Sequence, residues 1–295
     1  MIMIHFRPIS DFNSAVIAMR SGEMDVVYNV ALNEQAEFEA DPNFDTQSFD
    51  RVNVQGIAMN NQSPKLSDVR VRQAILHSLD RESINIMVAE GRYNTDTWTQ
   101  MPKIGEGYDD SRITKYAFDP EKAKGLLAEA GYDESNPLTL QLKSLSNTYV
   151  QQFSTAVQAS LAQSGIVVEV EEQESALWFQ SLTGDRANAE LVYMEIAIQE
   201  YWAPLMYWYA YDSTGFYNFN SISVPEIDAI VQDNLRQADV ATREAAYADM
   251  LEMLSSQARE CVIFQLNGFV ATTKGLTTYH DNSHMITWLA EATWS

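Results

Sequence analysis

Apolar residues recur along the chain in two rhythms, one typical of helices and the other typical of strands. Between residues 10 and 20, Phe12, Val16 and Met19 fall on one face of a helix. The next segment, 25–30, is short and apolar, as a buried strand is. The same rhythms predict further helices over 67–79, 80–88, 119–130, 149–163, 176–182, 226–237 and 242–257, and strands over 52–60, 137–142, 166–170, 191–198 and 262–266. Because strands and helices alternate, the sequence predicts an α/β protein with a substantially parallel sheet.

Residues at the ends of these segments support the predicted boundaries. Ser67 is expected to cap the helix that follows it, and Asp80 to end that helix and begin the next. Asp119 and Pro120 are the residue types preferred at the cap and in the first turn of a helix. Residues 91–115 are expected to be rich in loops, and the residues after 266 to form short strands in an irregular tail.

The first residues read directly as a strand, over 1–6, with no basic segment followed by an apolar one. A chain that opens inside a strand–helix–strand unit leads us to expect that a further part of the protein precedes it.

Acidic residues dominate the charge. The 295 residues include 41 Asp and Glu against 19 Lys and Arg, which gives a formal net charge of −22. Such a charge repels phosphate backbones and anionic membranes, so we expect no nucleic-acid partner. No run of about 18 apolar residues occurs, so no segment is expected to span a membrane. The single cysteine, Cys261, lies in an apolar run and is expected to be a core residue of a strand.

Signals of catalysis and of metal binding are weak. The four histidines lack metal-ligand spacing, and the closest pair, His280 and His284, lies in a polar tail rather than a clear helix. No glycine-rich phosphate loop or nucleophile elbow occurs. We therefore expect a protein that is not an enzyme and that uses no cofactor or metal.

Five motifs occur in an order that one protein family shares. They are MRSGEMD at 19–25, LSDVRVRQAI at 66–75 with LDR at 79–81, YAFDPEKAK at 116–124 with LLAEAGY at 126–132, PEIDAI at 225–230 and REAAY at 243–247. Through them the chain resembles the family 5 extracellular solute-binding proteins of ABC transporters, such as the oligopeptide- and dipeptide-binding proteins. Most of these residues have structural explanations, since Asp68 suits a helix cap and Arg70 and Arg72 suit salt bridges. The motifs therefore identify a fold and not ligand contacts.

The resemblance implies an α/β, periplasmic-binding-protein-like (type II) fold with two lobes that enclose a ligand. It implies that this chain is incomplete, holding all of the second lobe and the C-terminal part of the first. Residues 1–60 would belong to lobe I, 61–261 to lobe II, and 262–295 to the return to lobe I, with hinges near Asn60 and Val262.

The resemblance also implies a position for the ligand's ammonium group. In peptide-binding relatives, a strand of the second lobe leads to an acidic residue that holds the free ammonium of the peptide, and a proline follows. Glu200 and Pro204 match these positions after the strand over 191–198, although relatives more often have Asp at the first of them. A carboxylate in a partly desolvated cleft makes a charge-assisted hydrogen bond to an ammonium.

Aromatic residues are dense after this acidic position. Nine of them lie between 201 and 219, and we expect at least half to belong to the core. Tyr201 and Trp202 flank Glu200 and are expected to line the ligand pocket. Trp178 and Asn218 are further candidates for ligand contacts.

The function implied is capture of an oligopeptide or similar solute and its delivery to the permease subunits of an ABC transporter. Relatives of this kind are bacterial monomers that work in the periplasm, or as lipoproteins anchored on the outer face of the cytoplasmic membrane. Two alternatives remain open. One is the ligand-sensing domain of a transcriptional regulator, and the other is a binder of glycans or metal chelates from the same family.

Overall fold

The computed structural model describes residues 5, 7, 9, 12–28, 30–103, 105–184, 189–197, 203–281 and 286–294, of which 12, 13, 278–281 and 286–291 are described by backbone alone. The chain divides into two compact units. Unit 1 comprises Met1–Val52 and Leu266–Ser295, and unit 2 comprises Asn53–Gln265. From the sequence we expected the boundaries after residues 60 and 261, whereas the units divide after residues 52 and 265. The assignment of the units to lobes stays a prediction. The strand expected over 1–6 lies outside the described residues.

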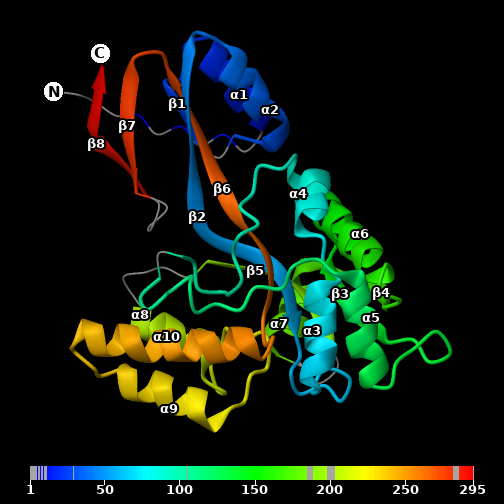
Figure 1. Ribbon diagram of the computed structural model, residues 1–295. Coiled ribbons are helices and arrows are strands. Elements are labelled where there is room, and N and C mark those ends of the chain that lie inside the picture. Colours follow the sequence, from blue (N-terminus) through cyan, green and yellow to red (C-terminus); the bar gives the residue numbers. More distant parts are fainter. Residues whose placement is uncertain are drawn as a thin grey trace. The chain divides into compact units, whose positions relative to one another are not determined.

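Unit 1 contains a short antiparallel pair of strands and two helices. Strand β1 (Val26–Tyr28) pairs with the later part of β6 (Cys261–Thr273), with Val26 opposite Thr272. Helices α1 (Phe12–Arg20) and α2 (Leu32–Ala40) supply the core residues Val16, Met19 and Phe38, which pack with Phe269 of β6. The long strand β2 (Phe44–Met59) begins in this unit, and the hairpin of β7 (Leu276–Asp281) and β8 (Ile286–Trp294) follows β6 (Figure 1).

Helix α2 and the first half of β2 were not predicted from the sequence. Only Gln35 and Phe38 of α2 are buried, so its apolar residues show no helical period. The first half of β2 is mostly exposed and polar, and it lacks the alternation that marks a half-buried strand. Strand β6 is also longer than the expected 262–266, and the short strands expected after 266 pair as β7 and β8, with a register shift between Thr277 and Tyr279.

Unit 2 is built on a mixed sheet. Strands β2, β5 (Leu191–Ala197), β3 (Thr139–Leu145) and β4 (Val167–Gln173) are neighbours in that order. Strand β3 is parallel to both β4 and β5, whereas β2 is antiparallel to β5. The expectation of a substantially parallel sheet is thus only partly correct. Apolar periodicity identifies a strand but carries no information about its direction.

The helices predicted for unit 2 are present, within a few residues of their expected bounds. They are α3 (Val69–His77), α4 (Arg81–Ala89), α5 (Pro120–Glu129), α6 (Thr148–Ala162), α7 (Ser175–Thr183), α9 (Pro225–Asn234) and α10 (Val240–Ser256). Helix α3 lies beside α5, and α4 lies beside α6 (Figure 1).

Carboxylates cap these helices. Asp68 caps α3 by accepting a hydrogen bond from the Arg70 amide, whereas the hydroxyl of Ser67, the other expected cap, donates to the Pro64 carbonyl oxygen. Asp80 caps α4 and Asp119 caps α5, both as expected.

The two faces of strand β5 have different roles. Val192, Met194 and Ile196 belong to a large buried cluster that includes residues of α9 and α10. On the other face, the Tyr193 ring packs edge-on against Phe153 of α6, with 5.3 Å between centroids. Strand β5 is therefore covered on both sides.

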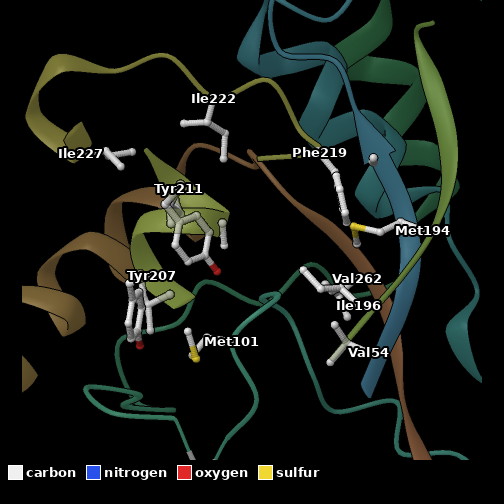
Figure 2. Close-up of a cluster of buried hydrophobic side chains, with 14 of the residues drawn as sticks. Val54, Met101, Met194, Ile196, Tyr207, Tyr211, Phe219, Ile222, Ile227 and Val262 are labelled. Carbon is white, nitrogen blue, oxygen red and sulfur yellow. The ribbon is translucent and has the colours of Figure 1, made fainter. Parts of the chain in front are cut away.

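Helix α8 (Ala203–Tyr211) was missed, because its residues are apolar on all sides and give no period. It contributes Tyr207 and Tyr211 to the buried cluster shown in Figure 2. The Tyr207 ring stacks on Tyr247 of α10 at 3.8 Å between centroids. Five of the seven described aromatic residues from 203 to 219 are buried in this cluster or pack against it, as expected for the core.

Cys261 is fully buried at the start of β6, as predicted, and burial raises the pKa of its thiol to about 12. Gly56 of β2 lies against it: a Cβ at Gly56 would sit 2.1 Å from the Cys261 carbonyl oxygen. Only glycine allows the two backbones to approach so closely.

Candidate functional site

The acidic candidate and its two aromatic neighbours, Glu200, Tyr201 and Trp202, lie outside the described residues. Their place in the chain is clear, since β5 ends at Ala197 and α8 begins at Ala203. Their contacts with a solute stay a prediction.

A polar cluster lies on β5 immediately before this segment. In the antiparallel ladder, Gln55 of β2 stands opposite Glu195. Asn53 and Tyr193 lie two residues away on the same two strands, so all four side chains project from one face. Tyr149, in the first turn of α6, reaches the same place through its hydroxyl group. We call these five residues the Glu195 cluster.

Three neutral side chains hold the Glu195 carboxylate. Asn53 Nδ2 lies 3.2 Å from Oε1, and Gln55 Nε2 lies 3.1 Å from Oε2. The Tyr193 hydroxyl is 3.4 Å from Oε2 and at the limit of a hydrogen bond. In the described part of the chain, no Lys, Arg or His forms an ion pair with this carboxylate. The cluster therefore fixes the carboxylate without neutralising it.

The phenols of the cluster remain neutral donors. Burial raises the pKa of Tyr149 and of Tyr193 above the usual value for tyrosine. The charge of Glu195 raises the pKa of Tyr193 further. The sequence signal for this cluster is the order Tyr193, Met194, Glu195, in which polar side chains alternate with apolar ones along a buried strand. Sequence reasoning concentrated on the residues after the strand and missed it.

Trp178, a candidate from the sequence, lies next to this cluster. Its indole Nε1 donates a hydrogen bond to the Tyr193 carbonyl oxygen at 3.0 Å, and the two rings lie 6.0 Å apart between centroids. The side chain is half-buried, so one part of the ring remains accessible.

Asn218, the other described candidate, is 1% exposed and its hydrogen bonds are local. Its Nδ2 donates to the carbonyl oxygens of Asp212 and Ile222, and its Oδ1 accepts from the Ile222 amide at 2.8 Å. These bonds favour a role in holding the loop after α8 in place.

The arginines of the resemblance motifs serve the fold. Arg70 forms an ion pair with Asp68 at 2.6 Å, as expected. Arg72 is buried and makes no salt bridge. Its guanidinium instead donates to the carbonyl oxygens of residues 66, 67, 257 and 258.

Arg81 is buried beside a small cavity. Its Nη1 donates to the Thr97 carbonyl oxygen at 2.6 Å, and its guanidinium lies 3.7 Å from the centroid of the Trp98 ring. The cavity has a volume of about 270 Å³ and is lined by Arg81, Trp98, Phe118 and neighbouring residues. Among its carboxylates, Asp96 is paired with Lys103 and Lys115, which hold the pKa of Asp96 well below its usual range. Its other carboxylates are held by neutral donors: Asp80 accepts hydrogen bonds from Ser83, and Glu82 accepts one from the Thr95 hydroxyl.

Two kinds of feature are absent from the described residues. No group of three or more His, Cys, Asp or Glu residues in these ranges could hold a metal ion. None of the helices in the same ranges is long and apolar enough to cross a bilayer.

Comparison with known proteins gives relatives along most of the chain. An ABC transporter peptide-binding protein of Brucella ovis is 31% identical over 187 residues, which are 61% of this chain and 34% of the relative. A glutathione-binding protein of Pectobacterium atrosepticum is 22% identical over 295 residues, covering 94% of this chain and 54% of the relative. The chain thus spans about a third to a half of the length of these relatives.

Solved structures share the fold. A peptide-binding protein, AppA, from Clostridium difficile superposes with a TM-score of 0.85 at 18% identity, covering 97% of this chain and 60% of the other. This match confirms the expected periplasmic-binding-protein-like α/β fold.

The family model described as bacterial extracellular solute-binding proteins, family 5 middle, matches residues 3–219. This range includes three of the five sequence motifs in full, together with β5 and α8. The chain belongs to the family 5 bacterial extracellular solute-binding proteins.

Proposed function

We propose that this chain is the solute-capturing part of an ABC-transporter binding protein, which holds an oligopeptide or similar solute and delivers it to the permease subunits. The observation that carries the proposal is the family match over residues 3–219. The peptide-binding description of the Brucella relative supports a peptide as the solute.

The proposed site begins where β5 ends. Glu200 would accept hydrogen bonds from the α-ammonium group of the peptide, and Tyr201 and Trp202 would cover the adjacent part of the ligand. Trp178 would extend this apolar surface, since its half-buried ring lies against Tyr193 of the same strand. The central group of the proposed site is the Glu200 carboxylate, which would pair with the ammonium and would not react with it. We therefore propose that the protein binds its solute without catalysis.

The proposal places the protein outside the cytoplasmic membrane, in the periplasm or lipid-anchored on the outer face of the cytoplasmic membrane. It would act there as a monomer. Its partners would be the solute and the permease, because the family binds solutes extracellularly. The net charge of −22 makes nucleic acid an unsuitable partner.

Ligand-observed NMR on the 295-residue chain tests this function and detects weak binding. The ligands are a mixture of tri- and tetrapeptides with free termini, a maltotriose glycan and a nickel–histidine chelate. The proposal expects saturation transfer to the peptides and competition among them. Transfer to the glycan or the chelate alone, or to no ligand at all, would contradict it.

A further inference from the structure

The Glu195 cluster contains a carboxylate that is held by neutral donors and has no cationic partner among the described residues. Its donors are two amides and a phenol, and none of them carries a positive charge. The Glu195 residue is itself exposed, whereas Gln55 and Tyr193 are buried beneath it. The charge is therefore presented outward from a rigid base, and the free lone pairs of the carboxylate remain available to a donor.

The orientation of the Gln55 amide is fixed by its two neighbours. An ionised carboxylate can only accept hydrogen bonds, so the NH₂ group of Gln55 must face Glu195. The Gln55 oxygen then faces Tyr149, whose hydroxyl donates to it at 2.6 Å. These hydrogen bonds link Tyr149 on α6, Gln55 on β2 and Glu195 on β5. They hold the Gln55 oxygen on the side away from Glu195, so a cation at Glu195 does not meet it.

A second acceptor lies beside the carboxylate. Asn53 Nδ2 donates to Glu195 Oε1, but Asn53 Oδ1 accepts no hydrogen bond from the described residues. Asn53 is 8% exposed, so this oxygen is a buried acceptor without a donor. Buried acceptors are normally paired. This oxygen is enclosed, so a donor group at Glu195 Oε1 would use both oxygens only once the Asn53 side chain turned outward.

Aromatic rings lie on the buried side of the cluster, behind Tyr193. Tyr193 packs on Phe153, and Phe153 packs on Phe264 with 5.9 Å between centroids. The half-buried Trp178 ring beside the cluster offers an apolar surface, which favours a cation that carries an aliphatic stem. An ammonium or guanidinium group at the end of a side chain has this form.

We propose that Glu195, with Asn53, is a specificity site for a basic side chain of the bound peptide, separate from the Glu200 position that takes the α-ammonium. The proposal rests on the proposed function, because the basic group belongs to the same solute. The two carboxylates are five residues apart in the chain, at the end of one strand and in the segment that follows it.

Four tripeptides test this assignment. Alanine flanks either lysine or norleucine, which has a similar length and no charge, and each peptide is made with a free and with an acetylated N-terminus. Dissociation constants come from two-dimensional NMR titrations of the 295-residue chain at low ionic strength. We expect the lysine peptides to bind about fivefold more tightly than the norleucine peptides, with either N-terminus.

The variant Glu195→Gln is expected to abolish the preference for lysine and leave the norleucine peptides unchanged. Asn53→Ala should reduce the preference while Glu195 remains. The matched control is Glu169→Gln, which removes one exposed charge from β4 of the same sheet and should leave all four constants unchanged. Thermal unfolding of each variant shows whether it is folded.

The outcomes separate this inference from the proposed function. An unchanged preference for lysine in a folded Glu195→Gln variant would overturn the site and leave peptide capture intact. Glu195→Gln could instead weaken the two peptides with a free N-terminus and leave the two acetylated peptides unchanged, whichever side chain they carry. That result would assign the α-ammonium to Glu195 and would also overturn the proposed side-chain site. Failure of the wild-type chain to bind any of the four peptides would overturn both.

Discussion

Gln55 and Glu195 face each other across the antiparallel pair of β2 and β5, and the Gln55 amide donates to the Glu195 carboxylate at 3.1 Å. This contact joins residues 140 positions apart in the sequence. It fixes a charged group at the end of the strand that leads to the proposed ligand segment. The hydroxyl of Tyr149 completes the arrangement by donating to the other end of the Gln55 amide.

Removing that hydroxyl should destabilise unit 2. In Tyr149→Phe, the Gln55 oxygen loses its donor in a residue that is only 2% exposed. We expect the free energy of unfolding to fall by about 1–2 kcal/mol, because an unpaired buried acceptor remains. Urea denaturation measures the change. Tyr132→Phe, at a partly exposed site after α5, is the control and should lie within about 0.5 kcal/mol of wild type. Equal losses in the two variants would mean that the hydrogen bond contributes nothing specific.

Arg81 should not tolerate the conservative change to lysine. The guanidinium both donates to the Thr97 carbonyl oxygen and lies over the Trp98 ring, and an ammonium cannot do both. We expect Arg81→Lys to lower the free energy of unfolding by about 2–4 kcal/mol. The exposed Arg236→Lys provides the control, with no measurable change expected. A fully stable Arg81→Lys protein would show that the stacked guanidinium is dispensable.

Glu260 gives the chain a pH-dependent stability. The residue is 3% exposed, and burial raises the pKa of its carboxyl to about 7, against 4.5 as its ordinary value. The folded state therefore holds this proton more tightly than the unfolded state does. The stabilisation is fully present below about pH 4.5, and it is lost as the pH rises to about 7. The loss should amount to about 3 kcal/mol at neutral pH and above.

The variant Glu260→Gln isolates this effect, because its amide resembles the protonated carboxyl. We expect the variant to be more stable than wild type at pH 8 and similar to it at pH 5. Differential scanning calorimetry at several pH values measures the difference between the two proteins, so other titrating groups cancel. A difference that is independent of pH would contradict the assignment.

The aromatic segment 203–219 should divide into core and surface positions. Tyr207 is fully buried and stacks on Tyr247, whereas Phe216 is 46% exposed. We expect Tyr207→Ala to lower the free energy of unfolding by about 3–5 kcal/mol, and Phe216→Ala by less than about 1 kcal/mol. Chemical denaturation of the two variants provides the comparison. Similar losses would show that the segment packs differently from the cluster in Figure 2.

The parts of the fold that sequence patterns predicted are those with one buried face and clear end signals. Helix α5 shows both, with Asp119 as the cap, Pro120 in the first turn, and Ala123 and Leu127 buried. Helix α8 has one buried face, but the residues on its other faces are also apolar, so its sequence has no period to detect. Strand direction was also inaccessible, because apolar periodicity is the same in either direction, yet β2 is antiparallel to β5 and β3 is parallel to it.

The candidate site was predictable only in part. The resemblance led to Glu200, which follows β5 in the chain, and Trp178, proposed separately as an aromatic candidate, packs beside that strand. The Glu195 cluster depends on the register between β2 and β5, and a sequence alone does not give the pairing of distant strands. Asn218 had the right residue type for a polar ligand contact, but its amide is engaged by Asp212 and Ile222 within its own loop.

Recognition of a peptide's free ammonium by Glu200 is the central claim, and a two-by-two set of dissociation constants tests it most directly. Wild type and Glu200→Gln are each titrated with one peptide in free and N-acetylated form. The account predicts a loss of about 1.5–3 kcal/mol, or about ten- to a hundredfold in affinity, for the free peptide and almost none for the acetylated one. Equal effects of Glu200→Gln on the two peptides would contradict it, even if both affinities fell.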